Sequence, residues 1–466
     1  MNSKNIVHYL EHYAVGPRWE LIANDMSRID NAVVIPSLAE REHLFATLAS
    51  IATNPRPELD RTLVICVINN GAHGHALPGV YDNNQQTLEI LGELLHDRIS
   101  DAAGEALCPD LAAILAAGLR LAVVDASSPG RELPERDRGV GLARKIGFDL
   151  ALEVFDHAGD TPGLLFSLDA DTLVADNYLE AVRTFFARYT RHAAFIAFRH
   201  QAGDTPDAEA AIACYETFLR YYVLGLWVAG SPYAVHSIGS TIACTAEGYA
   251  AVRGMNKRKA GEDFYFLNKL AKLRGIGFID ATTVYPSARQ SDRVPFGTGR
   301  RITRFLEGQR YEYSLYNPEI FAILGKWIDC MAVCADERCD AAAVMARAAA
   351  IHPLLVRYLE GLHFEDVWHR LKRNNKTART LRYQCHVWFD GFRTLKLINF
   401  MTRHGLEPVP MFDAVRRVLV MAGSDAVPAD GDGVIPLLEV QQRFLAHLRE
   451  FEQRVLVHRA HDFQFG

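Results

Sequence analysis

Short apolar runs that stop abruptly at polar residues are the feature that most constrains the fold of this chain. They lie at residues 32–35, 63–68, 121–124, 164–168 and 193–198. Runs of this length suit single buried strands, whereas helices need longer segments. Between the first two runs, Leu44, Leu48 and Ile51 recur at helical spacing. Strand, helix and strand in succession form a βαβ unit, so the sequence predicts an α/β domain with a mostly parallel sheet flanked by helices.

Polar side chains follow two of these runs at the point where each strand should end. Asp169 and Asp171, separated by Ala170, follow the run at 164–168, and Asn69 and Asn70 follow the run at 63–68. Open α/β sheets bind ligands at the carboxyl ends of their strands. Paired carboxylates there can bind a hard cation that in turn holds a diphosphate. An ordinary strand-to-helix turn would use the same residues, so both interpretations stay open.

Arginines and glycines mark further candidate sites for an anionic ligand. Arg138 and Arg144 flank a glycine-rich helix start, where backbone N–H groups favour anions. This segment is neither a dinucleotide fingerprint nor a P-loop. Arg289 and Arg293 belong to a segment rich in arginine and glycine, whose composition suits a mobile lid over a charged ligand. A solvated basic loop is the alternative.

Composition limits the class of protein. The chain is 49% hydrophobic and 23% charged, with a formal net charge of -6. Nucleic acid is therefore not expected as a main partner, because phosphate binding requires a basic surface. Eight scattered cysteines indicate reduced thiols in a cytoplasmic protein. The most apolar long segment, 212–230, contains Glu216 and Arg220, so no transmembrane segment is predicted.

The domain organisation follows from where the strand pattern ends. Residues 1–300 are predicted to form the α/β domain, with a helical lead-in at 1–30 and an insertion at 71–120. Helical periodicity alone continues over 301–466, which predicts an all-α C-terminal domain. Its last helix could pack within its own domain or form a homodimer with a second copy. His8 and His12 share a face of the first helix and, without a third ligand nearby, are interpreted as surface residues.

Five short motifs occur in a fixed order along the chain. They lie at 33–40, 138–147, 169–171, 238–240 and 254–263, and the first includes Ser37 and Glu40 at the spacing of a helix capping box. Together they resemble family 2 glycosyltransferases with a GT-A fold, over roughly residues 30–300. Two departures are Asn69-Asn70, where such enzymes usually carry an acidic residue, and the absence of a Gln-x-x-Arg-Trp segment.

The resemblance implies a nucleotide-diphospho-sugar donor, a hydroxyl acceptor and Mg²⁺ or Mn²⁺. It assigns the metal to Asp171 and Asp169, and the catalytic base to Asp263 with Glu262 beside it. The expected donor-binding residues are Pro36, Ser37, Glu40, Asn69, Asn70, Arg138, Arg144, Asp169, Ala170, Arg289 and Arg293. The expected acceptor side comprises Gly239 and Ser240, with His200 and His236 as further candidates.

The function expected from these features is inverting, metal-dependent transfer of a sugar to a hydroxyl group. A single displacement needs charge neutralisation on the leaving diphosphate and a base for the acceptor hydroxyl, and these residue types can supply both. Three alternatives remain. They are a nucleotidyltransferase of similar architecture, a glycoside hydrolase that uses a carboxylate pair, and a non-catalytic protein that binds sugar nucleotides or a partner.

Overall fold

The computed structural model describes residues 3–71, 79–99, 101–157, 162–290, 297–308, 311–424 and 435–462. The chain forms two compact units, Met1–Ala202 with Ser237–Arg300, and Gly203–His236 with Arg301–Gly466. The division predicted at residue 300 therefore differs from the structure in one segment, since Gly203–His236 packs with the C-terminal helices. None of the described helices combines the length and the apolarity needed to cross a bilayer.

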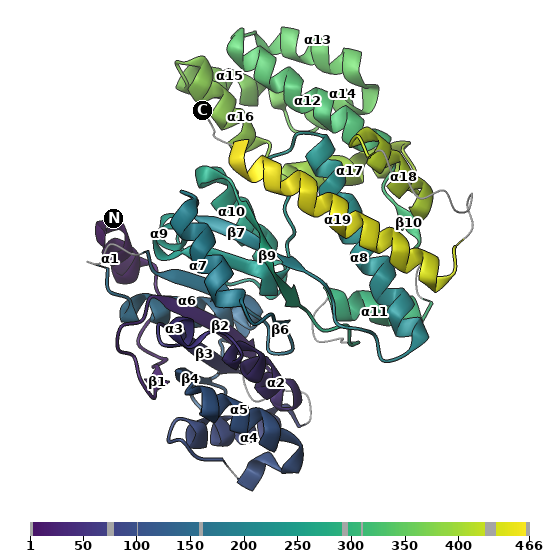
Figure 1. The fold of residues 1–466 in the computed structure, drawn as a ribbon. Helices are drawn as coiled ribbons and strands as arrows, with labels where there is room; N and C mark the ends of the chain where they lie inside the picture. The colour runs from purple at the N-terminus through teal and green to yellow at the C-terminus, as the bar shows by residue number, and fades with distance from the viewer. Residues whose placement is uncertain are drawn as a thin grey trace. The chain divides into compact units, whose positions relative to one another are not determined.

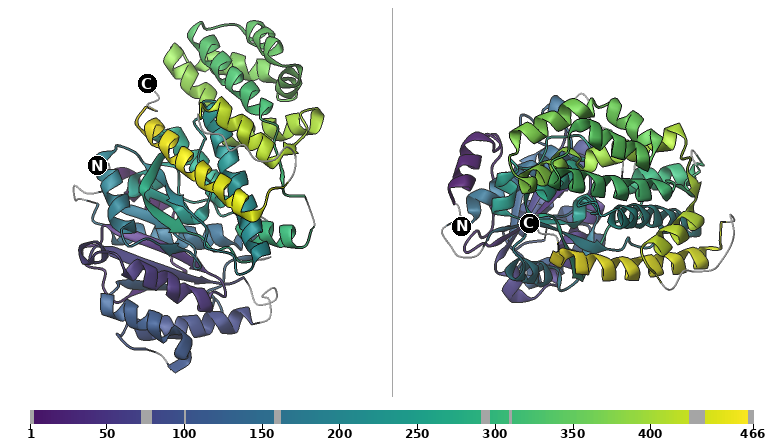
Figure 2. Two further views of the ribbon diagram at one scale, coloured as in Figure 1. Left: turned by 45° about the vertical axis from the view of Figure 1, so that its right-hand side comes forward. Right: turned by 90° about the horizontal axis from the view of Figure 1, so that it is seen from above.

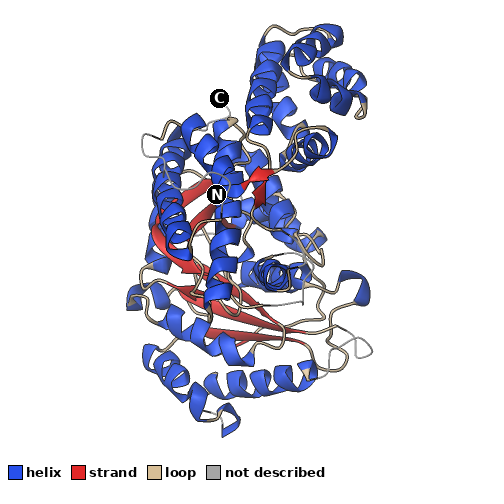
Figure 3. Ribbon diagram, turned by 90° about the vertical axis from the view of Figure 1, so that its right-hand side faces the viewer, coloured by secondary structure: helices blue, strands red, loops and turns tan. Residues whose placement is uncertain are grey.

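The first unit is built on one sheet, drawn in red in Figure 3 with helices on both sides. Its strands are β1 (Ile22–Ala23), β2 (Asn31–Ser37), β3 (Thr62–Asn69), β4 (Leu121–Ala126), β5 (Leu164–Ser167), β6 (Leu173–Val174), β7 (Ala193–Phe198), β8 (Ile242–Thr245) and β9 (Gly277–Tyr285). They lie in the order β1-β4-β3-β2-β5-β8-β7-β9-β6.

Parallel pairing dominates the centre of this sheet. Strand β2 pairs in parallel with β3 and β5, β3 pairs in parallel with β4, and β7 pairs in parallel with β9. Strand β8 runs antiparallel to both of its neighbours, β5 and β7. Strands β2, β3, β5, β7 and β9 consequently end at the same edge. The predicted α/β architecture, a mostly parallel sheet flanked by helices, is confirmed.

Helices cover both faces of the sheet (Figure 1). They are α1 (Ser3–His12), α2 (Arg41–Ala52), α3 (Arg56–Leu59), α4 (Val80–Leu94), α5 (Cys108–Ala117), α6 (Val140–Val154), α7 (Tyr178–Arg188), α9 (Ala246–Ala251) and α10 (Glu262–Arg274). Short 3-10 turns occur at Asp101–Ala103, Glu105–Leu107, Glu135–Asp137 and Gly239–Thr241.

The alternation of side chains along the strands decides which helices they meet. Val33 and Val64 point to one face, where they form one apolar core with α2, α4, α5 and α7. Val34 points to the opposite face, where a Cβ at Gly147 of α6 would collide with its side chain. Because Gly147 lacks that atom, α6 packs directly on β2. Figure 2 shows the strands of the sheet and the helices around them from two further sides.

Three segments of the first unit can be compared with their predicted local structure. Within the predicted insertion at 71–120, the described residues form α4 and α5, and the status of this segment as an insertion stays a prediction. The capping box is wrong, because Ser37 is the last residue of β2 and Glu40, which precedes α2, makes no side-chain cap. The lead-in at 1–30 is helical only over α1, and β1 follows it. That short strand pairs with the edge of β4.

The second unit is helical, as predicted for the C-terminal region. Its helices are α8 (Pro206–Val228), α12 (Glu319–Asp336), α13 (Ala341–Ile351), α14 (Pro353–Glu360), α15 (Phe364–Asn374), α16 (Ala378–Trp388), α17 (Gly391–His404), α18 (Met411–Met421) and α19 (Leu438–Asp462). Helix α11 (Thr298–Leu306) spans the boundary, and β10 (Ser314–Leu315) pairs with β11 (Val409–Pro410). The last helix, α19, packs along α8 within this unit.

Candidate active site at the carboxyl ends of the strands

Asp169 and Asp171 leave the end of β5 on a turn whose backbone is held from two sides. Thr47 of α2 donates its hydroxyl to the carbonyl of Ala170 at 2.9 Å. The Gln201 amide donates to the carbonyl of Asp171 at 3.0 Å and to that of Tyr285 at 2.8 Å. Buried carbonyls with such partners keep one conformation, so the two carboxylates are presented from a fixed backbone.

Arg144 of α6 links the first carboxylate to the start of α10. Its guanidinium donates to the carboxylates of both Asp169 and Glu262. The side chains of Arg144 and Glu262 are almost fully buried, whereas that of Asp169 is 37% exposed. The remaining Arg144 nitrogen, Nε, is buried without a hydrogen-bond partner in the described part of the chain. Arg144 therefore lies between two carboxylates, of which Asp169 is accessible to solvent and Glu262 is not.

Missing Cβ atoms make this approach possible. A Cβ at Gly239 would collide with the Arg144 guanidinium, and a Cβ at Gly141 would lie 2.6 Å from the carbonyl of Arg258. Gly139 meets the backbone of Lys259 in the same way. The glycines of the 138–147 motif thus bring the start of α6 against the loop before α10, which carries Glu262.

Arg289 forms a second bridge at the same edge. Its Nε donates to Oδ2 of Asp171 at 2.8 Å, and its Nη2 donates to Glu40. Arg289 follows β9, while Glu40 follows β2, so the bridge joins distant parts of the sheet. Glu40 therefore binds this arginine instead of capping α2. Charge-assisted pairs of this kind are stronger than neutral hydrogen bonds.

Asp263 is a carboxyl group of altered acidity at this edge. Partial burial and the adjacent Glu262 carboxylate raise its pKa to about 7, although Arg144 opposes the shift. The backbone N–H of Phe264 donates to its Oδ1 at 2.7 Å. A carboxyl group with a pKa near neutrality can accept a proton and release it again under physiological conditions.

The ends of β2 and β3 offer polar atoms that no described residue binds. Ser37 Oγ and Asn70 Nδ2 are buried and have no hydrogen-bond partner among the described residues. Nearby, Asn84 of α4 connects the segment after β2 to the end of β3. Its Nδ2 donates to the carbonyl of Asn69 at 3.0 Å, and its Oδ1 accepts from the Ala39 N–H at 2.8 Å. Buried polar atoms without a partner are costly, which marks them as candidate ligand contacts.

The donor set fits a hard divalent cation. Oδ2 of Asp169 and Oδ1 of Asp171 have no hydrogen bond to another residue of the described chain. Five carboxyl groups, those of Glu40, Asp169, Asp171, Glu262 and Asp263, face two guanidinium groups, so the edge carries an excess of negative charge. Carboxylate oxygens are the ligands that Mg²⁺ and Mn²⁺ prefer.

The other predicted site residues have different surroundings in the structure. Pro36 lies in β2 and Ser240 in the turn before β8, both buried, and His200 follows β7 with Nε2 3.2 Å from Thr298 Oγ1. Arg138 pairs with Glu135 at 3.3 Å and packs over Gly71. His236 belongs to the second unit, where its Nε2 lies 2.5 Å from Glu452. Arg293 lies outside the described residues. The roles assigned to these residues stay predictions.

Three positioning residues were missed from the sequence. Thr47, Asn84 and Gln201 each hold the backbone of a strand end and carry no charge. The available signal was polarity on a buried helix face, since Thr47 and Asn84 interrupt the apolar faces of α2 and α4. Gln201 gave none, because its partners are backbone atoms that only the fold brings together.

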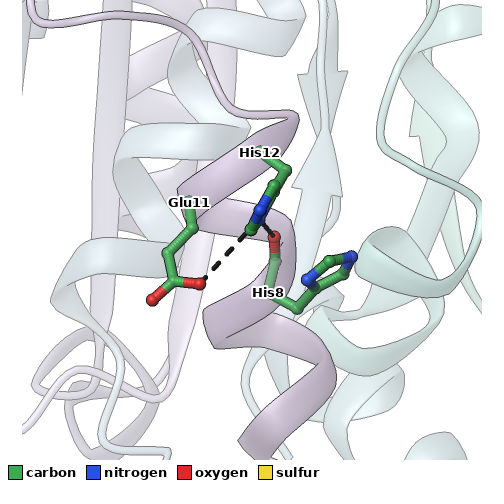
Figure 4. Close-up of side chains that lie close together, drawn as sticks. All are labelled: His8, Glu11 and His12. Atoms are coloured by element: carbon green, nitrogen blue, oxygen red, sulfur yellow. Dashed lines mark hydrogen bonds and ion pairs between the residues drawn. The ribbon is translucent and has the colours of Figure 1, made fainter.

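The first helix holds a separate group of potential metal ligands. One ligand atom from each of His8, Glu11 and His12 lies within 4.8 Å of the others, and all three side chains are exposed (Figure 4). It is the one such trio of His, Cys, Asp or Glu in the described chain. Glu11 supplies the third ligand that the sequence interpretation lacked, yet His12 Nδ1 already contacts the His8 carbonyl at 3.0 Å.

Comparison with known proteins adds little. No protein-family model and no curated protein matches the sequence. Among solved structures, residues 1–349 of TarS from S. aureus match with a TM-score of 0.34 and 11% identity, over 72% of this chain and 92% of that one. Its complex with UDP-GlcNAc gives 0.32 and 13%, over 92% and 91%.

A mannosyltransferase from Pyrobaculum calidifontis, in complex with GDP-Man and Mn²⁺, gives a TM-score of 0.33 and 14% identity, over 83% of this chain and 95% of that one. Likenesses this slight carry no conclusion about the fold or the activity of this chain. The architecture and the site described above rest on its own residues.

Proposed function

We propose that this protein is an inverting, metal-dependent glycosyltransferase that moves a sugar from a nucleotide-diphospho-sugar to a hydroxyl acceptor. One observation carries the proposal. At the same sheet edge, Asp169 and Asp171 each keep one carboxylate oxygen without a partner among the described residues, while the nearby Asp263 has a pKa raised to about 7. The first arrangement suits a cation with a diphosphate, and the second suits a general base.

Asp171, with help from Asp169, would hold Mg²⁺ or Mn²⁺, which when bound neutralises negative charge on a leaving diphosphate. The two arginines at the site could also neutralise negative charge on the diphosphate. Arg289 and Arg144 now donate to carboxylates, and each could turn a donor N–H toward phosphate oxygens once those carboxylates bind a cation. Both guanidinium groups are already held at this edge by their carboxylate partners, Arg144 buried and Arg289 partly exposed, so they supply positive charge there before a donor binds.

Asp263 accepts the proton of the acceptor hydroxyl in this scheme. The hydroxyl oxygen then attacks the anomeric carbon from the face opposite to the diphosphate, and a single displacement inverts the configuration. Glu262 contributes indirectly, since it binds Arg144 and raises the pKa of Asp263. The acceptor would lie beside Gly239, Ser240 and His200.

The nucleotide part of the donor would be bound by polar groups at the ends of β2 and β3. Ser37 Oγ and Asn70 Nδ2 are buried without a hydrogen-bond partner in the described part of the chain, so they can bond to a base or ribose. An amide can donate as well as accept, unlike the acidic residue usual at this position in the family that the sequence resembles.

Transfer can be tested with purified protein, a panel of nucleotide sugars, Mn²⁺ and simple hydroxyl acceptors, by measuring release of nucleoside diphosphate. Asp171→Ala and Asp263→Asn should each lower turnover at least 100-fold, since each removes a group that acts on the reacting atoms. Asp176→Ala and Asp280→Asn are matched controls, because both residues are exposed on the same unit.

Three outcomes would overturn the proposal. Full activity in both site variants would remove the assigned roles. Release of inorganic diphosphate from a nucleoside triphosphate would indicate a nucleotidyltransferase, and sugar release without nucleotide in the presence of EDTA would indicate a hydrolase.

A further inference from the structure

The α15–α16 hairpin of the helical unit carries an unusual concentration of positive charge. Residues 369–384, here called the basic corner, contain six Lys and Arg residues and no acidic residue, in a chain with a net charge of -6. These six are Arg370, Lys372, Arg373, Lys376, Arg379 and Arg382. All except the half-buried Lys372 are exposed. Figure 1 draws α15 and α16 together at one end of this unit.

Two exposed carboxylates in the first turn of α15, Glu365 and Asp366, and three outside the hairpin leave most of this charge unpaired. Asp336 pairs with Arg382, Glu337 binds Arg347 at 2.6 Å, and Asp340 caps α13 through the Ala343 N–H at 2.8 Å. No carboxylate of the described chain pairs with the other five cations of the basic corner. Like charges crowded on a surface are unfavourable, so this concentration calls for an anionic partner.

The backbone beneath the charges is fixed by a further arginine. Arg338, which follows α12, donates to the carbonyl of Asn375 at 3.0 Å and to that of Lys372 at 3.3 Å. Arg338 itself has a left-handed backbone, with φ of 51°. Arg338 therefore holds the connection between α15 and α16 in place. It also adds another positive charge next to the basic corner.

The apolar side chains of the hairpin are not available to a partner. Phe364, Val367 and Trp368 of α15 are buried within the unit, and no large hydrophobic residue of α15 or α16 is exposed. Single-stranded nucleic acids need aromatic platforms for stacking, and insertion into a bilayer needs exposed apolar residues. The only rings of the basic corner are the exposed imidazole of His369 and the half-buried Tyr383, so charge dominates the recognition of a partner.

We propose that the basic corner docks on the surface of an anionic lipid bilayer. A bilayer offers negative headgroups over a plane, which suits cations spread over the outer surfaces of two helices. Each Lys or Arg near such a surface strengthens binding by about five-fold. Attraction of this kind is screened by salt, since the Debye length falls from about 10 Å at 0.1 M to about 3 Å at 1 M.

Sedimentation of the full chain with lipid vesicles tests the proposal. Vesicles of phosphatidylcholine with about one third phosphatidylglycerol should bind the protein at low salt, whereas pure phosphatidylcholine vesicles should not. The variant Arg370→Glu/Arg373→Glu/Arg379→Glu should lose about 100-fold or more in affinity. Binding should also be lost at 1 M salt.

A matched triple variant separates the basic corner from net charge. Lys326, Arg357 and Arg403 are exposed on other helices of the same unit, so Lys326→Glu/Arg357→Glu/Arg403→Glu changes the net charge equally and should keep binding. Asp171→Ala should also bind vesicles normally, whatever the outcome for glycosyl transfer. Equal losses in the two triple variants, or equal binding to neutral vesicles, would overturn the proposal. Tighter binding to a single-stranded oligonucleotide than to anionic vesicles would do the same.

Discussion

At the residue scale, the raised pKa of Asp263 predicts how the activity depends on pH. Because its pKa is raised to about 7, activity should rise with pH through that value as the base becomes deprotonated. Asp263→Asn should leave a low activity that no longer follows this titration. Initial rates between pH 5 and 9 under saturating donor measure it. An unchanged pH profile in the variant would assign the titration to another group.

The raised pKa of Asp263 also predicts that the stability of the protein falls as the pH rises, whereas its activity should increase. The folded protein holds this proton more tightly than the unfolded chain, so deprotonation lowers stability as the pH rises from the usual aspartate pKa to above 7. Asp263→Asn should therefore be more stable than the native protein at pH 8, by on the order of 1 kcal/mol. The difference should vanish near pH 4, which urea unfolding at both pH values can show.

Gly239 offers a test of how closely the site is packed. A Cβ there would collide with the Arg144 guanidinium, so Gly239→Ala should displace Arg144 from Asp169 and Glu262. Overpacking of this kind costs about 1–3 kcal/mol, and activity should fall at least ten-fold. Gly92→Ala, where a Cβ would meet nothing within 4 Å, provides the control in thermal and kinetic measurements. Equal effects of the two substitutions would contradict the packing argument.

At the element scale, α1 is anchored to the first unit by a buried carboxylate. Tyr9 of α1 donates to Asp149 at 2.6 Å, Tyr249 of α9 donates to it at 2.7 Å, and Lys145 pairs with it at 2.9 Å. Asp149→Asn leaves the lysine buried without its counter-charge, so it should cost about 3–5 kcal/mol. Glu153→Gln, an exposed change one turn along α6, should cost far less in chemical denaturation.

Elements were predictable where one residue pattern dominates over a whole segment. The apolar runs at 32–35 and 63–68 fixed two central strands, because buried parallel strands are continuously apolar. The start of α2 was missed because the backbone of Ser37 pairs within β2 and the Glu40 carboxylate binds Arg289, nearly 250 residues later. Local spacing carries no information about a partner so distant along the chain.

At the scale of the whole molecule, the second unit is held together by a buried ionic network between α8 and α19. Arg220 bonds to Glu216 at 2.8 Å and also to Glu452, and Glu452 accepts from His236 at 2.5 Å. Although burial opposes it, His236 and Arg220 hold the pKa of Glu452 below its usual value. A lowered carboxyl pKa adds stability above the usual glutamate pKa, and that stability is lost as pH falls through the folded value.

Glu452→Gln should weaken this unit selectively. Removing one member of a buried ionic network costs about 3–5 kcal/mol, because Arg220 loses part of its counter-charge. Hydrogen exchange should accelerate in α8 and α19, while β2 and β3 in the other unit stay protected. Glu450→Gln, two residues earlier and exposed, is the matched control. Uniform acceleration over both units would contradict a local role.

The sequence by itself determined the α/β character of the first unit, the helical character of the second and the placement of Asp169 and Asp171 after a strand. Each depends on the periodicity of neighbouring residues, which short-range sterics and burial set. Only the tertiary structure decided that Gly203–His236 joins the C-terminal helices and that Arg144 and Arg289 bridge carboxylates from distant segments. These features depend on charge pairing and close backbone approach, which exist only once the sheet has formed.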